Sequence, residues 1–166
     1  MEKHKIASSV ALGGILAGLA VVIMALGGMI PVATFVCPML CMLLLKLVYN
    51  RCGVRMAWAW YGAVAFLGAL LSPDKEAAAV FIALGYYPIC KPKLDVLKMN
   101  WLWKLILFNA VIFALYSLLM YVMGMEQLMS EFADMGGLMT AVTLMLGNVC
   151  FFLLDRLLGL RFRGRR

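Results

Sequence analysis

The chain of 166 residues is 66% hydrophobic and only 14% charged, whereas soluble domains average about a quarter charged residues. One small core cannot bury so many apolar side chains, so lipid must solvate much of the surface. The composition excludes an ordinary soluble domain and predicts one all-α integral membrane domain over residues 1–166. The net charge of +7 suits anionic lipid headgroups, so we expect the bilayer rather than a nucleic acid as partner.

Six apolar stretches are long enough, or nearly long enough, for the roughly 20 residues that a spanning helix needs. Pro31, Pro73 and Pro88 punctuate them where helices should start, stop or kink. The first stretch is too long for a signal peptide and should remain as a membrane helix. The predicted spans are about 6–30, 32–49, 56–71, 75–90, 101–123 and 137–158.

The basic residues predict the orientation of these spans. If both termini are cytoplasmic, fourteen of the fifteen Lys and Arg residues fall on the inner face and only Lys75 on the outer. The acids on the outer loops show the opposite bias. We therefore predict a multi-pass protein of the bacterial plasma membrane, with the N-terminus and C-terminus in the cytoplasm. The basic stretch at 90–103 is either an interfacial connector or a docking surface for a partner.

Signatures of catalysis are missing from the sequence. The chain has no H-E-x-x-H pair, no P-loop and no G-x-S-x-G elbow. The spans are nearly free of ionisable residues away from their ends, which disfavours a pump. His4 is the only histidine, and the five cysteines resemble small buried thiols more than a metal site or a disulfide framework. We predict no enzyme activity, no cofactor and no metal.

The first span is rich in small residues spaced four apart. Ala7 and Ala11 form one such pair, and Gly14 and Gly18 form another. Small side chains let two helices approach closely in lipid. The stripe serves either packing within this protein or a seam for another membrane subunit.

Two amides lie at similar depth in the fifth and sixth spans. Asn109 and Asn148 are each about two turns from the inner end of their predicted span. A buried amide needs a partner, so the two either hydrogen-bond each other or contact a ligand. Interhelical bonds of this kind contribute about 0.6 kcal/mol.

Three charged residues follow a proline at the outer end of the third span. Ser72 is expected as an N-cap, Pro73 as the first helical residue, and Asp74 and Glu76 as complements to the helix dipole. The same turn is also placed to meet a solute from outside. Lys75 with the helix N-terminus would suit an anion, and the two acids would suit an amine.

The layout of the chain resembles the substrate-binding S component of energy-coupling factor (ECF) transporters. The likeness rests on six short spans, a first helix that begins with Ala7-x-x-x-Ala11, and a first loop at "GGMIPVATFVCPML". The stretch "PDKEAAAVFIALGYYPICKP" also looks like one in poorly characterised bacterial six-span membrane proteins.

The resemblance implies a micronutrient or vitamin importer with separate partners. A transmembrane coupling subunit and an ATPase pair would drive uptake, and the coupling subunit would meet Ala7, Ala11, Gly14 and Gly18. The small-molecule substrate would lie at the outer face near Thr34, Asp74, Lys75, Glu76, Tyr116, Thr140 and Thr143, with Asn109 and Asn148 as its floor. The alternative is a non-transporting membrane interaction or assembly protein with the same fold.

Overall fold

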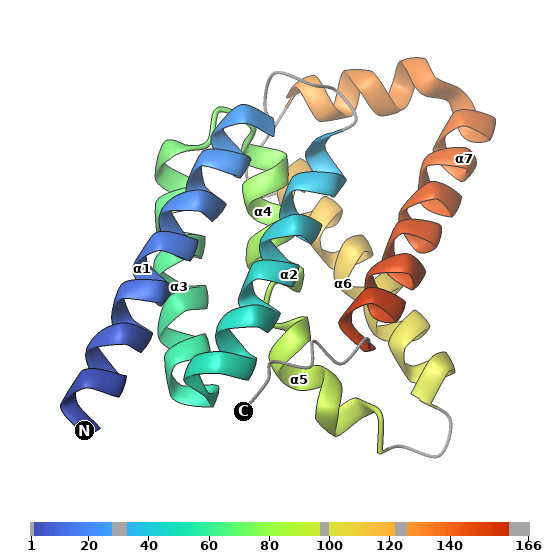
Figure 1. Cartoon of the computed structure of the whole chain (residues 1–166). Helices are drawn as coiled ribbons and strands as arrows, with labels where there is room; N and C mark the ends of the chain where they lie inside the picture. Colours follow the sequence, from blue (N-terminus) through green and yellow to red (C-terminus); the bar gives the residue numbers. More distant parts are fainter. Residues whose placement is uncertain (1, 28–32, 97–99, 122–125, 160–166) are drawn as a thin grey trace.

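Every regular element in the described part of the chain is a helix (Figure 1). The computed structural model describes residues 2–27, 33–96, 100–121 and 126–159, and the side chains at 9–27, 35–96, 101–119, 121, 141–142 and 144–159. The helices are α1 (Glu2–Gly27), α2 (Ala33–Cys52), α3 (Val54–Leu71), α4 (Lys75–Leu84), α5 (Tyr87–Leu94), α6 (Asn100–Tyr121) and α7 (Glu126–Gly159).

Four of these helices are long and apolar enough to cross a membrane. The qualifying segments are Ser9–Gly27, Phe35–Cys52, Val54–Leu71 and Trp101–Leu119. Large apolar side chains point away from the bundle, among them Ile15, Phe66 and Phe113, each at least 70% exposed. Such surfaces are unfavourable in water and favourable in lipid, so the chain has the character of a membrane protein.

The predicted fourth span is not one continuous helix. Residues 75–90 instead form α4 and the beginning of α5, which are separated by Gly85 and Tyr86. Pro88 lies in the first turn of α5, and its missing N–H would break a continuous helix at this point. Together α4 and α5 run from one end of the bundle to the other (Figure 1). The buried side chains of α4 include Ala78, Val80 and Phe81.

The last helix is longer than predicted. Helix α7 has 34 residues, about 51 Å at 1.5 Å per residue, which exceeds the roughly 30 Å hydrocarbon core of a bilayer. Its first part lies across one end of the bundle before the helix turns along the bundle (Figure 1). The predicted span 137–158 lies within it.

Helix α2 lies at the centre and packs against α1, α3, α4, α5 and α7. Two side chains of α3 tie its neighbours together through main-chain oxygens. The indole Nε1 of Trp60 donates to Gly13 O at 3.0 Å, and the hydroxyl of Tyr61 donates to Ile82 O at 2.6 Å. The first bond joins α3 to α1, and the second joins it to α4, the next helix in the chain.

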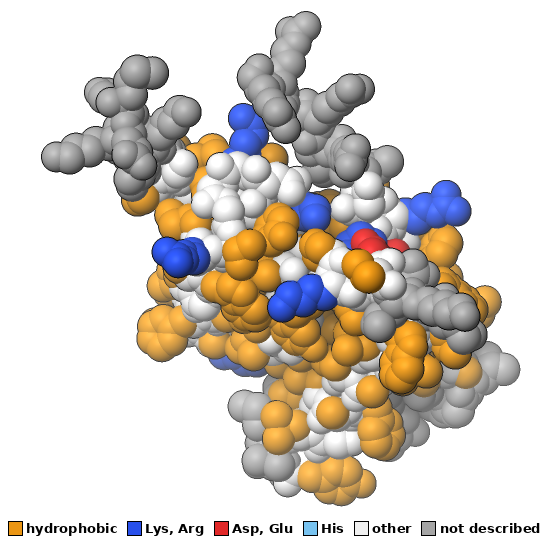
Figure 2. Space-filling view, turned by 90° about the horizontal axis from the view of Figure 1, so that it is seen from below, with side chains coloured by type: hydrophobic (Ala, Val, Ile, Leu, Met, Phe, Trp, Pro, Cys, Tyr) orange, Lys and Arg blue, Asp and Glu red, His pale blue; other side chains and the backbone are white. Residues whose placement is uncertain are grey.

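Helix α1 begins and α7 ends at the same end of the bundle (Figure 1). Figure 2 looks onto this end, where Lys and Arg side chains project at several places among apolar ones and acidic side chains form one small patch. The basic bias predicted for the inner face therefore has a counterpart at one end of the fold. Cys37 and Cys41 are buried, and none of the five cysteines is disulfide-bonded.

Candidate functional site

The turn between α3 and α4 caps α4 through a different residue than expected. Asp74, not Ser72, is the N-cap, and its side chain accepts a 2.9 Å hydrogen bond from Ala77 N. Ser72 instead ends α3 and is buried, with its Oγ 3.2 Å from Met24 O. Because Pro73 precedes the helix rather than starting it, the prediction of Ser72 as cap was wrong by two residues.

The side chains of Asp74, Lys75 and Glu76 have different partners. The Lys75 Nζ reaches back to the end of α3 and donates to Ala69 O at 3.0 Å. Glu76 points the other way and accepts a hydrogen bond from the Tyr116 hydroxyl of α6. Two residues predicted to bind substrate, Glu76 and Tyr116, thus contact each other and join α4 to α6.

A groove of about 690 Å³ begins at Lys75 and continues between α4 and α6. Its volume falls within the range of ordinary ligand sites. Five of its eleven lining residues are alanine, and Lys75 is the one charged residue among them. The lining is Ala69, Lys75, Ala78, Ala79, Ile82, Ala83, Val111, Ala114, Leu115, Leu118 and Leu119.

Asn109 and Asn148 hydrogen-bond each other, as the interhelical interpretation expects. The Nδ2 of Asn109 lies 2.9 Å from Asn148 Oδ1, and the reciprocal distance is 3.2 Å. Each amide also donates to a carbonyl one turn earlier, Leu105 O or Leu144 O, at 2.9 Å. All four amide hydrogens therefore have acceptors within the protein, and the pair joins α6 to α7 without a ligand.

For the remaining predicted contact residues the structure describes only the main chain. Thr34 lies in the first turn of α2, and Thr140 and Thr143 lie within α7. The side chains of these threonines, and that of Ala7 in α1, are outside the described residues.

The small-residue face of α1 is uncovered. Ala11, Gly14 and Gly18 are all exposed, and a Cβ added at Gly14 or Gly18 would meet nothing within 4 Å. Gly13, by contrast, turns inward, and its added Cβ would lie 3.1 Å from the Met56 side chain. Packing within this protein therefore does not account for the exposed part of the stripe.

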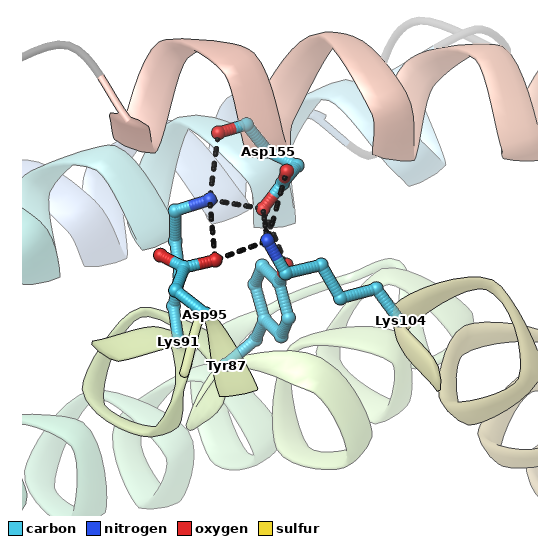
Figure 3. A network of polar contacts seen from close by, with 5 residues as sticks. All are labelled: Tyr87, Lys91, Asp95, Lys104 and Asp155. Carbon is cyan, nitrogen blue, oxygen red and sulfur yellow. Dashed lines mark hydrogen bonds and ion pairs between the residues drawn. The ribbon is translucent and has the colours of Figure 1, made fainter. Parts of the chain in front are cut away.

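A network of charged side chains with two buried lysines lies where α5, α6 and α7 meet (Figure 3). Lys91 and Lys104, only 6% and 8% exposed at their side chains, both pair with Asp155 of α7. Lys104 also pairs with Asp95, and Tyr87 donates to Asp155 Oδ1 at 2.5 Å. Two lysines and two aspartates balance in charge, so the network clamps α5 and α6 to α7.

The network changes the interpretation of the basic stretch at 90–103. Lys91 and Lys104, counted among the inner basic residues, turn into the protein and are not available to a lipid headgroup or a docking partner. Two features of the sequence could have indicated this network. They are the spacing Lys91-x-x-x-Asp95 and the presence of Asp155 as the lone acid of the predicted span 137–158. Among the described residues, no cluster of His, Cys, Asp and Glu has a metal-binding arrangement.

Comparisons with protein families, with curated proteins and with solved structures gave no match to this chain.

Proposed function

We propose that the chain is the substrate-binding membrane subunit of a bacterial ECF-type importer of micronutrients. In this proposal it crosses the plasma membrane six times, with α4 and α5 together as the fourth crossing, part of α7 as the sixth and both termini in the cytoplasm. Chemical energy comes from separate ATPase subunits, which act through a transmembrane coupling subunit. The chain itself is not an enzyme.

The observation that carries the proposal is the uncovered small-residue face of α1. Ala11, Gly14 and Gly18 leave a strip of helix where a second helix can approach closely, which is what a membrane partner requires. The groove that begins at Lys75 supplies a place for the captured molecule. A partner seam and a substrate site on one small chain fit a subunit that captures a solute and depends on others for transport.

Affinity purification from the host's membranes, followed by native mass spectrometry, tests this function. We expect two ATPase chains and one larger membrane subunit to accompany the wild-type protein. Gly14→Leu with Gly18→Leu fills the seam and should abolish their association. Gly62→Leu is the matched control, because Gly62 is also an exposed helical glycine whose added Cβ meets nothing within 4 Å.

The second candidate is a membrane interaction or assembly protein that does not transport. The almost wholly apolar lining of the groove favours it, because a vitamin with many polar groups would find few partners there. Recovery of a membrane partner without any ATPase, lost in the same double variant, would establish this function and exclude the importer.

A further inference from the structure

The groove between α4 and α6 opens on the surface of the bundle, and almost all of its lining is apolar. Its walls are Ala78, Ala79 and Ala83 on one side and Ala114 and Leu118 on the other, with no polar side chain between them. The small side chains of Ala78, Ala79 and Ala83 on α4 and of Ala114 on α6 leave space between the two helices. The volume of about 690 Å³ is more than a buried water needs and suits an apolar chain.

Lys75 lies at one end of this groove and is the one charged residue among those that line it. The Lys75 ammonium has three hydrogens, and its bond to Ala69 O occupies one of them. Among the residues that the structure describes, Lys75 takes part in no ion pair. Among the described residues, the ammonium therefore leaves two hydrogens that a ligand at the groove mouth could accept.

The acids on either side of Lys75 both have hydrogen-bond partners within the protein. Asp74 caps α4 through Ala77 N, and Glu76 accepts from the Tyr116 hydroxyl. Neither carboxylate lines the groove. An anion at the mouth would thus meet the lysine directly and the two acids only from the side.

The length of the groove matches one leaflet of a bilayer. It extends from Lys75 to Ala83 along α4 and from Leu119 to Val111 along α6, about 12 Å at 1.5 Å per residue. Half the hydrocarbon thickness of a bilayer is about 15 Å. A molecule with its charged group at Lys75 would reach into the leaflet to about the depth of an acyl chain.

We propose that this groove binds an anionic phospholipid-like amphiphile from the outer leaflet, with one acyl chain between α4 and α6 and its phosphate at Lys75. The inference rests on the proposed function for the role of the site, and it replaces a polar micronutrient with a lipid-like substrate. In this proposal the substrate enters the groove from within the bilayer and not from the external water. The positive charge of Lys75 favours a headgroup with net negative charge, and the apolar lining of the groove accommodates the chain.

Native mass spectrometry of the purified full chain in detergent tests the proposal with two lipids. Phosphatidylglycerol and phosphatidylcholine of identical acyl chains are offered together, and decanoate is offered separately as a free anion. We expect phosphatidylglycerol to bind about tenfold more tightly than phosphatidylcholine, because both lipids have a phosphate but the choline ammonium offsets that charge and is repelled by Lys75. Raising the salt concentration should reduce the preference.

Two variants with matched controls assign the binding to the groove. Lys75→Gln should remove the preference for phosphatidylglycerol, whereas Lys93→Gln, at an exposed lysine on α5, should retain it. Ala114→Leu fills the groove and should lower the occupancy of both lipids. Ala110→Leu, at an exposed alanine one turn away on α6 that does not line the groove, should leave occupancy unchanged.

The outcomes separate this inference from the proposed function. Equal occupancy by both lipids, with ATPase subunits still accompanying the chain from its host, would overturn the substrate class and leave the importer. Decanoate binding that depends on Lys75, without phospholipid binding, would overturn the bilayer as its source. Selective phosphatidylglycerol binding without any ATPase partner would support the lipid site and overturn the importer.

Discussion

The hydroxyl of Tyr87 donates to Asp155 Oδ1 at 2.5 Å and joins α5 to α7 across 68 positions of sequence. The same carboxylate receives the ammonium groups of Lys91 and Lys104. One acid of α7 therefore satisfies three buried polar side chains from two other helices. This concentration makes Asp155 the residue on which the packing of α5 and α6 against α7 depends.

Replacing Asp155 is expected to destabilise the protein strongly. Asp155→Ala leaves two almost fully buried lysines without this partner, and breaking a buried pair costs about 3 kcal/mol. Thermal unfolding in detergent measures the loss, with Arg156→Ala at the adjacent exposed position as control. Tyr87→Phe should cost less, about 1 kcal/mol, because it removes one hydrogen bond. Equal melting temperatures for Asp155→Ala and the wild type would contradict the clamp.

Gly85 tolerates no larger side chain at the junction of α4 and α5. A Cβ there would lie 2.4 Å from Phe81 O and 2.8 Å from Tyr61 Cε2. Gly85→Ala should therefore destabilise the protein by about 1–3 kcal/mol, as overpacking does. Gly62→Ala, with nothing within 4 Å of its added Cβ, should be neutral or slightly stabilising. An unfolding curve for Gly85→Ala like that of Gly62→Ala would argue against a close approach at Gly85.

The side chains of Asn109 and Asn148 should be coupled in their contributions to stability when no ligand is present. Asn109→Leu leaves Asn148 without its partner on α6, and Asn148→Leu does the reverse. A double-mutant cycle in detergent should give a coupling of about 0.6–1.7 kcal/mol, the range for interhelical hydrogen bonds in membranes. Additive losses from the two single variants would show that the pair contributes no coupling.

The bond from Tyr116 to Glu76 should stabilise the first turn of α4. Tyr116→Phe removes a hydroxyl that donates to a carboxylate, and such bonds contribute about 1.5 kcal/mol or more. Tyr121→Phe is the control, since Tyr121 lies at the end of the same helix and is 85% exposed. If the two variants unfold at the same temperature, the bond does not hold α4 to α6.

The local chemistry of the sequence correctly indicated several features of the fold. Long apolar runs predicted α1, α2, α3 and α6. A helix makes its backbone hydrogen bonds within its own segment, so its presence can be predicted from its own residues. The shared depth of Asn109 and Asn148 predicted their contact. The junction at Gly85 was missed because the apolar run continues through it, although Pro88 was already noted as a stop.

Apolar composition and the distribution of charge by themselves determined that this chain is helical and has the character of a membrane protein. Only the tertiary structure decided which charges are buried, because Lys91 and Lys104 become partners of Asp155 when α5, α6 and α7 meet. It also decided that Gly14 and Gly18 stay uncovered and that the alanines of α4 line a groove shared with α6. These features depend on which helix faces are adjacent, and the periodicity of a single helix does not specify its neighbours.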